Sequence, residues 1–430
     1  MTNTVSTLSG LFKEVYAEKL SNLIPDGVKL IKMVPFIQSD KEIGNLYHQP
    51  VQLSHEHGVT YAGPNSSAFT LMAPIAAVLQ DGQVAGSQML LRSAMSYEAA
   101  ARASNDKKAF VKATQLMVQN MMNSISKRVE IAVLYGQSGL GVSASSANVG
   151  VGSTRVTFAT ASWAPGIWAG SESAALVAYD AANARINASD VAGFTVSSVS
   201  LSGRTVLFTA ANADIAALDI ACAAGPVRFF FLSAVTGSAG TYSPQEFAGL
   251  DKIVTNTGLL FNINAANYAL WQGNSYDALG AALSLSKILS AVSLAVERGL
   301  DEDVICLVAN KTWSNIASDQ AALRMYDSSY KSAKSEAGSE SFSFHGQNGK
   351  IEIVESIYIK EGEAFILPVK KLKRIGAMDI SFKMPGRQQQ EDFFLELANG
   401  AGYELRVYTD QALFCESPAK MVKIINIVNS

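Results

Sequence analysis

The sequence predicts an α+β protein in which a β-rich module interrupts a larger fold. A helical pattern of about 30 residues precedes the interruption, and alternating strand patterns fill it. After the module the chain returns to mixed helix and strand patterns. At 430 residues it exceeds the usual size of a single core. We therefore expect an α+β fold with an inserted β-rich domain.

The N-terminal segment has helical spacing, and turn chemistry follows it. Pro25, Asp26 and Gly27 end the pattern, and an extended segment follows to about Tyr47. Its apolar side chains recur three or four residues apart, at Leu8, Leu11, Phe12, Val15, Leu20 and Leu23.

From His48 to Gly86 no helical period is present, and prolines stand at positions 50, 64 and 74. Loops of this length are functional or disordered. This one is too apolar for disorder, so another surface must cover its side chains. The apolar side chains concerned are Val59, Tyr61, Phe69, Leu71, Met72, Ile75, Val78 and Leu79.

The strongest helical pattern begins after Asn105-Asp106, which offers a helix cap, and runs without proline or interior glycine to Gly136. At 1.5 Å per residue its roughly 30 residues form a rod of about 45 Å. Its apolar face is Phe110, Ala113, Met117, Met121, Ile125, Val129 and Ala132.

The segment after this helix, GQSGLGVSASSANVGVGS, has the composition of a flexible connector. It leaves a helix and lacks the G-K-[ST] of a phosphate loop, so nucleotide binding is not predicted. Ser202-Gly203 provides a hairpin turn within the strand patterns that follow. These patterns are TRVTFAT, AALVAYD, GFTVSSVSLSGRTVLFTA and GPVRFFFLSA.

In the C-terminal part, we predict a buried helix over Leu279–Val296, a strand at VICLVA, and a second helix opened by Asn310. In KIEIVESIYIKEGEAFILPV, two strands flank a turn at Glu361-Gly362. Further strand patterns close the chain in YELRVYTDQALFCE and MVKIINIV.

Charge and cysteine content exclude several classes of protein. Lys plus Arg (34) nearly balance Asp plus Glu (37), so no overall field draws the chain to nucleic acid or a membrane. Charged residues make up only 17%, against roughly 25% in ordinary domains, which favours a surface shared with neighbours. The three cysteines form neither a disulfide framework nor a zinc motif. Without a signal-peptide pattern, we expect a soluble protein made in a cytoplasm.

Candidate catalytic residues have simpler explanations. His55 and His57 flank Glu56, but HEH is not the HExxH of a metalloprotease, and only His48 lies nearby as a third ligand. The acidic run at residues 301–303 lies in a predicted turn, where a solvated cluster is expected. No nucleophile elbow, Cys–His pairing, Rossmann motif or kinase motif is present. We therefore predict no enzyme and no cofactor.

Six runs of sequence carry a resemblance that covers nearly the whole chain. They are YHQPVQLSHEHGVTYAG, SKRVEIAVLYGQSGLGV, WAPGIWAG, FAGLDKIVTNTGLLFNI, RIGAMDISFKMPG and GYELRVYTDQALFCESPAK. In these runs and in the order of its parts, the chain resembles the major capsid proteins of tailed bacteriophages, the Hong Kong 97-type fold.

The resemblance implies a division of the chain into named parts, with SHEHG (Ser54–Gly58) as a strand of the loop. An insertion such as the β-rich domain could brace neighbours, decorate the shell or bind a host. The parts are an N-terminal arm (1–46), an extended loop and lead-in (47–105), a spine helix (106–141), the inserted β-rich domain (142–248), a return to the peripheral domain (249–273), an axial domain (274–345), and peripheral strands with the C-terminus (346–430).

The resemblance also implies a function: self-assembly, through pentameric and hexameric capsomers, into the icosahedral head shell around phage DNA. It implies assembly in the host cytoplasm, and portal, scaffolding and decoration proteins as partners. The implied intersubunit residues are Tyr61, Phe69, Leu71, Met72, Ile75 and Leu79, and the implied spine residues are Phe110, Met117, Met121, Ile125 and Val129.

Two other classes remain as alternatives. The first is a tail-fibre or bacterial surface protein whose β-rich module binds carbohydrate, and the second is a metal hydrolase using His55 and His57. Some members of the capsid family cross-link neighbouring subunits covalently, through an isopeptide bond between a lysine of the extended loop and an asparagine of the adjacent subunit. Here no lysine occurs between Lys41 and Lys107, so we expect a shell without such cross-links.

Overall fold

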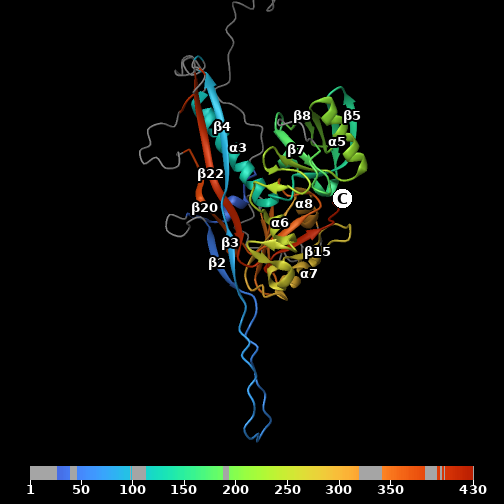
Figure 1. The fold of residues 1–430 in the computed structure, drawn as a ribbon. Helices are drawn as coiled ribbons and strands as arrows, with labels where there is room; N and C mark the ends of the chain where they lie inside the picture. Colours follow the sequence, from blue (N-terminus) through green and yellow to red (C-terminus); the bar gives the residue numbers. More distant parts are fainter. Residues whose placement is uncertain are drawn as a thin grey trace, which may run out of the picture. The chain divides into compact units, whose positions relative to one another are not determined.

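The structure is a computed structural model that describes residues 27–38, 46–96, 98, 113–186, 193–318, 341–382, 395–397, 400 and 402–429. The predicted N-terminal helix and Phe110 lie outside these residues. The described residues form two compact units, one from residues 89–126 and 380–409 and the other from 25–88, 127–379 and 410–430. Figure 1 shows the elements along the chain.

The first unit contains most of strand β4 (Ser87–Ser96), the first part of helix α3 (Ala113–Tyr135), the short strand β21 (Leu395–Glu396) and much of β22 (Gly402–Cys415). Both β4 and β21 pair with β22. On β22 the buried carboxylate of Glu404 forms ion pairs with Arg92 and Arg406. Burial by itself would raise the pKa of Glu404, but the hydrogen bonds and charges of Arg92 and Arg406 together lower it below its ordinary value.

Helix α3 confirms the helical pattern over residues 113–135. Met121, Ile125 and Val129 are buried, and the helix ends where Gly136 donates its N–H to the carbonyl of Ala132. The carboxylate of Glu130, also on α3, accepts backbone N–H groups from residues 29, 30 and 31 at 3.1, 2.8 and 2.9 Å. These are the unpaired donors at the start of the short helix α1 (Leu30–Met33).

The inserted module is a closed barrel within the second unit, with strand order β10-β5-β6-β9-β8-β7. Aromatic side chains fill its interior: the rings of Phe208 and Phe229 stack at 5.1 Å, and those of Phe158 and Trp168 lie 4.5 Å apart. The β8–β9 pair confirms the hairpin predicted around Ser202-Gly203. The strands are β5 (Gly141–Gly150), β6 (Ser153–Phe158), β7 (Ala175–Tyr179), β8 (Phe194–Ser200), β9 (Thr205–Thr209) and β10 (Arg228–Phe231).

Two features of the barrel differ from the sequence-based expectation. The predicted flexible connector contains strand β5, which pairs with β6 and β10, so the connector prediction was wrong. The small side chains of Gly141–Gly150 give no hydrophobic alternation, and the strand is specified by its partners. Helix α5 (Asn212–Ala224), which contacts β5 and β6, was not foreseen within a module read as strands.

The barrel is joined to the rest of the unit at two adjacent glycines. The chain leaves α3 at Gly136 and returns at Gly249, whose N–H donates to the carbonyl of Gly136 at 3.0 Å. A Cβ at position 136 would lie 2.3 Å from the carbonyl oxygen of Phe247. Only glycine allows the two backbones to approach this closely.

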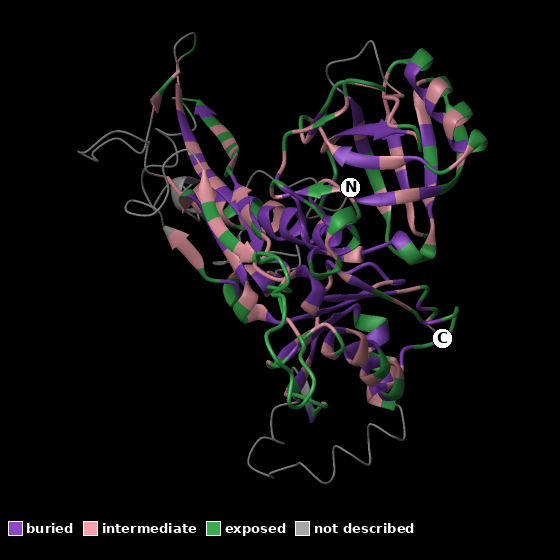
Figure 2. Cartoon of the chain, turned by 60° about the horizontal axis from the view of Figure 1, so that its bottom comes forward, coloured by how far each residue is buried: buried purple, intermediate pink, exposed green. Residues whose placement is uncertain are grey.

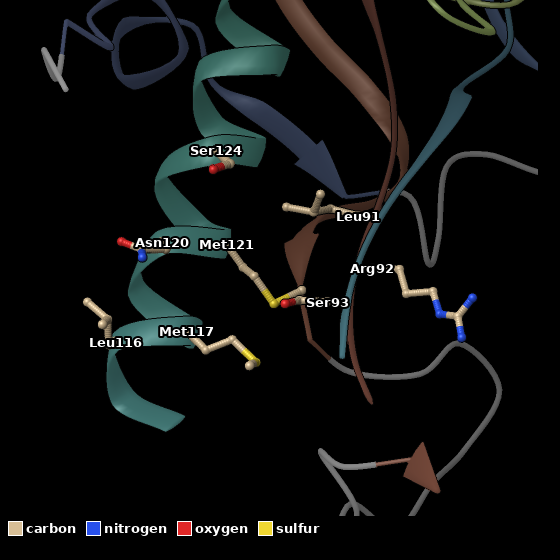
Figure 3. A pocket seen from close by; sticks show the side chains of 8 residues that line it. All are labelled: Leu91, Arg92, Ser93, Leu116, Met117, Asn120, Met121 and Ser124. Carbon is tan, nitrogen blue, oxygen red and sulfur yellow. The ribbon is translucent and has the colours of Figure 1, made fainter. Parts of the chain in front are cut away.

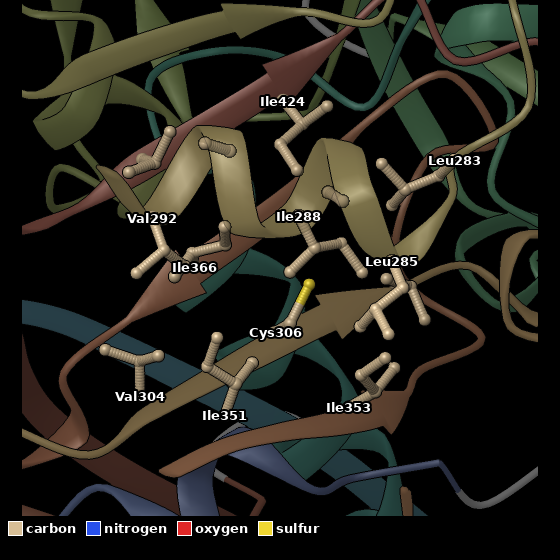
Figure 4. Packing of buried hydrophobic residues seen from close by; sticks show 14 of the residues in the cluster. Leu283, Leu285, Ile288, Val292, Val304, Cys306, Ile351, Ile353, Ile366 and Ile424 are labelled. Carbon is tan, nitrogen blue, oxygen red and sulfur yellow. The ribbon is translucent and has the colours of Figure 1, made fainter. Parts of the chain in front are cut away.

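A six-stranded sheet forms the largest core of the second unit, in the order β15-β23-β19-β16-β18-β17. Helix α7 (Leu285–Val296) packs Leu285, Ile288 and Val292 against it, beside Cys306 and Ile353 (Figure 4). The strands are β15 (Asn274–Asp277), β16 (Val304–Val308), β17 (Ser341–His345), β18 (Lys350–Glu355), β19 (Ala364–Leu367) and β23 (Val422–Ile425).

Helix α7 begins six residues later than the Leu279–Val296 helix expected from the sequence, and that expected start was wrong. Leu279 has a φ of 58° and Gly280 a φ of 67°, values that no α-helix adopts. The N–H of Ala278 donates to Ile425, so this segment continues the β15–β23 pairing before the helix begins. The sheet also joins strands from the predicted axial segment (274–345) and the segment that follows it (346–430).

Smaller elements complete the described chain. Strand β1 (Phe36–Gln38) runs parallel to β20 (Leu372–Ser381), which is followed in its sheet by β22. Apart from short 3-10 turns, the other described strands and α-helices are β2 (Tyr47–Gln52), β3 (Leu79–Val84), α4 (Pro165–Trp168), β11 (Val235–Thr236), β12 (Ser243–Pro244), α6 (Leu250–Thr255), β13 (Leu259–Leu260), β14 (Ile263–Asn264) and α8 (Asn310–Ser318).

Candidate intersubunit surface

The long apolar loop rises from a two-stranded stem, the antiparallel pair β2 and β3. The register pairs Tyr47 with Val84 and Gln52 with Leu79. Tyr47 packs edge-on against Phe414 at 5.6 Å, and the ring of Phe261 lies 5.1 Å from that of Phe414. These contacts fix the base of the loop against β22 and the turn between β13 and β14.

A polar contact crosses the stem. His48 Nδ1 lies 2.6 Å from Asp81 Oδ2, and Gln83 Nε2 donates to the same carboxylate oxygen at 3.0 Å. The hydrogen bond with His48, followed by that with Gln83, lowers the pKa of Asp81. His48 therefore has a structural partner on the neighbouring strand.

Beyond the stem, residues 53–78 form two arms that run side by side without a strand ladder (Figure 1). SHEHG is therefore not a strand, and that prediction was wrong. Prolines at positions 64 and 74 and glycines at 58 and 63 interrupt the pairing that a strand would need. The contacts across the arms are Leu53 N to Val78 O (2.9 Å), Val78 N to Ser54 Oγ (3.0 Å), His57 N to Ile75 O (3.1 Å) and Met72 N to Thr60 Oγ1 (2.8 Å).

The arms expose a concentrated apolar surface. Of the seventeen exposed large apolar side chains among the described residues, seven lie between Val59 and Leu79. The exposed fraction reaches 91% at Tyr61 and 74% at Leu71, and the arms are green along most of their length in Figure 2. All six predicted loop residues are exposed: Tyr61, Phe69, Leu71, Met72, Ile75 and Leu79.

No charged residue occurs between Glu56 and Asp81. A soluble surface normally mixes charges among its apolar side chains, and contiguous apolar patches mark interaction sites. We define residues 53–78 as the apolar loop. Its chemistry is suited to contact with an uncharged, apolar surface.

The predicted spine residues have a different environment. Met121, Ile125 and Val129 are buried in the body of the protein, and Met117 is half-buried beside a pocket. They support the fold and do not lie on the apolar loop. The pocket, described below, was not predicted, because no periodic pattern in the sequence distinguishes it from the apolar face of α3.

Catalytic and metal chemistry finds no support among the residues described. His55 and His57 are exposed on one arm. Within the described ranges, no three His, Cys, Asp or Glu side chains gather as a metal site would require. In the acidic run at residues 301–303, Asp301 forms an ion pair with Lys420 at 2.6 Å and Glu302 forms one with Lys371 at 3.3 Å.

The buried thiols are also unsuited to reaction. Burial raises the pKa of Cys306 and of Cys415 to about 12, so neither is a thiolate at neutral pH.

No helix within the described residues combines the length and the apolar character needed to cross a membrane.

Comparison with known proteins places this geometry in a known fold. No protein-family profile matches the chain, and no curated protein matches it in sequence. Among solved structures, a chain of the capsid asymmetric unit of cyanophage A-1(L) aligns over 99% of both chains with a TM-score of 0.56 and 9% identity. The alignment with a chain of Mycobacterium phage Bobi covers 99% of both chains, with a TM-score of 0.49 and 10% identity. The alignment with a capsid chain of the empty GTA particle covers 100% of both chains, with a TM-score of 0.48 and 7% identity.

The fold assignment rests on the cyanophage protein. The alignment extends over nearly the entire length of both chains, so the similarity includes the parts on either side of the barrel. The resemblance inferred from the sequence is therefore confirmed at the level of the fold. The chain has the mixed α/β, Hong Kong 97-like fold of phage capsid proteins.

Proposed function

We propose that this protein is a major capsid protein that assembles with copies of itself into the shell of a phage head. The observation that carries the proposal is the uncharged apolar loop, exposed on a chain with the capsid fold. Full burial of a large apolar side chain stabilises by roughly 1.5–3 kcal/mol. Several such side chains per contact are enough to drive association once the entropy of assembly has been offset.

The parts of the chain then take the roles that the resemblance implies. We assign residues 47–105 to the loop and its lead-in, 106–141 to the spine, and 274–345 to an axial domain that meets its copies around capsomer axes. Residues 142–248 form the insertion, and 249–273 and 346–430 belong to the peripheral domain. The protein is structural and has no catalytic role. Portal and scaffolding proteins, with a decoration protein, are the further partners, and the virion is its destination.

The experiment removes the arms and keeps the stem. Replacing residues 60–78 by a short Gly/Ser linker deletes five of the six predicted contact residues but leaves the β2–β3 pair intact. We expect folded subunits that do not close into shells. Circular dichroism tests the folding, and size-exclusion chromatography with negative-stain microscopy tests the assembly. Normal shells from this variant would remove the loop from the assembly mechanism.

Point variants separate apolar contact from loop length. Leu71→Asp with Met72→Asp places two charges on the apolar surface, whereas Ser66→Asp with Ser67→Asp places the same charges at the tip turn. We expect the first pair to block assembly and the second to retain it. Equal loss of assembly in both would mean that loop charge in general, and not the apolar contact, controls the result.

A further inference from the structure

A pocket of about 420 Å³ lies in the first unit, between strand β4 and helix α3. Met117 and Met121 extend from the helix toward Leu91 and Ser93 on the strand, while Arg92 points to the other face of β4 (Figure 3). The rest of the lining comes from α3, namely Leu116, Asn120 and Ser124.

The chemistry of the lining selects an apolar occupant. Methionine side chains are flexible and polarizable, so they adapt to aliphatic and aromatic groups of different shape. The guanidinium of Arg92 is already paired with Glu404 on β22, so it is not available as an anchor for an acidic ligand. The polar groups that remain are two hydroxyls and one amide.

The chain itself contains an apolar segment of suitable form outside the described residues. Leu8, Leu11, Phe12 and Val15 follow the i, i+3, i+4, i+7 spacing of one helix face. The described structure begins at Gly27, so 26 residues precede it.

The described chain that follows this segment is hydrogen-bonded to α3, the helix that lines the pocket. The backbone N–H groups of Lys29, Leu30 and Ile31 donate to the carboxylate of Glu130 on α3. Glu130 is six residues beyond Ser124, which corresponds to about 9 Å along the helix axis, and fourteen beyond Leu116, about 21 Å. At about 100° per residue, Glu130 lies roughly 40° from Leu116 around the helix and roughly 80° from Asn120.

The length of the connecting chain is sufficient. From Val15 to Lys29 there are fourteen residues, which span about 21 Å as a helix and up to about 46 Å when extended. We propose that the N-terminal segment docks the apolar face formed by Leu8, Leu11, Phe12 and Val15 into the pocket between β4 and α3 of its own chain. The segment then covers the pocket, with the half-buried Met117 in its lining, before any contact with another copy.

The test measures access to the pocket in dilute, unassembled subunits. Met117→Cys introduces a thiol into the lining, and the natural cysteines are buried. Maleimide labelling of this variant is compared with that of the same variant lacking residues 2–23. We expect labelling to accelerate by about tenfold or more, a factor equivalent to about 1.4 kcal/mol of docking free energy. A thiol at the loop tip, Ser67→Cys, should label at the same rate in both backgrounds.

Point variants keep the test valid if the deletion impairs folding. Leu11→Asp with Phe12→Asp should reproduce the faster labelling, and Lys13→Asp with Glu14→Lys should not. An unchanged rate at Met117→Cys with the apolar pair replaced would overturn the proposal. A second result would also overturn it: protection of the Met117→Cys thiol from maleimide that rises with protein concentration and disappears when residues 60–78 are replaced. That result would assign the pocket to the loop of a second copy. Neither outcome depends on shell formation, so the docking fails or holds independently of the capsid function.

Discussion

Glu246 provides a pH-dependent contact at the root of the barrel. Its Oε1 accepts the backbone N–H of Gln137 at 2.7 Å, and the Gln137 amide donates to the Glu246 carbonyl at 2.9 Å. Burial raises the pKa of Glu246 to about 7, although the Gln137 hydrogen bond and the nearby Arg128 guanidinium act to lower it. The folded protein therefore keeps this carboxyl protonated at a pH where the unfolded chain has released the proton.

The sign of the effect follows from this difference in pKa. The stability contributed by the protonated carboxyl is complete below the unfolded pKa of about 4.5 and is lost as the pH rises to about 7. A shift of about 2.5 pKa units corresponds to roughly 3 kcal/mol at most, and partial exposure of Glu246 reduces that figure. Glu246→Gln keeps an oxygen acceptor for Gln137 and removes the ionisation. We expect the stability of the variant relative to the wild type to be clearly greater near pH 8 than near pH 5.

The assay is urea unfolding followed by tryptophan fluorescence across this pH range. Two of the four tryptophans, Trp163 and Trp168, lie within the inserted segment and report on its unfolding. Glu56→Gln, on an exposed arm of the apolar loop, is the matched control and should leave the pH profile unchanged. If the difference between Glu246→Gln and wild type were the same near pH 5 and near pH 8, the carboxyl would not titrate in this range and the reasoning would fail.

Two further predictions concern the barrel and the assembled shell. The segment Leu140–Ala248, expressed alone, should melt cooperatively and give a β-type circular dichroism spectrum, because its six strands form a closed barrel. A random-coil spectrum would show that it folds only against the rest of the chain. Purified particles boiled in detergent and reductant should run as one band near 45.7 kDa on a denaturing gel, since no lysine is present between Lys41 and Lys107 to cross-link the loop to a neighbour. A ladder of bands at multiples of this mass would show that another lysine forms cross-links.

Periodicity predicted the elements whose identity is local. The described part of α3 and the β8–β9 hairpin follow from helical spacing and from turn chemistry, and both were read correctly from the sequence. Strand β5 could not be read in this way, because its Gly, Ser, Ala and Asn side chains carry no alternation. Its conformation depends on β6 and β10, which lie later in the chain.

The same limit explains the other differences. The apolar run from Ala278 fits a helix by composition, but its first residues bond to Ile425, which is about 150 residues away in the sequence. The apolar character of the loop was read from composition alone. The structure exposes all six named residues, five on the arms and Leu79 at the start of β3. The pocket beside Met117 and Met121 depends on which strand faces α3, information that no window of the sequence contains.

The paired glycines at the base of the barrel bear on how such a module can be gained or lost in evolution. Residues 136 and 249 are already joined by a hydrogen bond, so an excision of the intervening residues would leave two ends that a very short linker could reconnect. The reverse event, insertion of a module whose own termini are adjacent, would disturb little beyond this point. Two carbonyl groups impose the requirement for glycine at position 136: that of Phe247, which departs with the module, and that of Ala132 on α3, which stays and would lie 2.6 Å from a Cβ. Loss of the barrel would therefore remove one of the two clashes, and a relative without it could carry a side chain at that position only if the backbone after α3 also shifted away from Ala132.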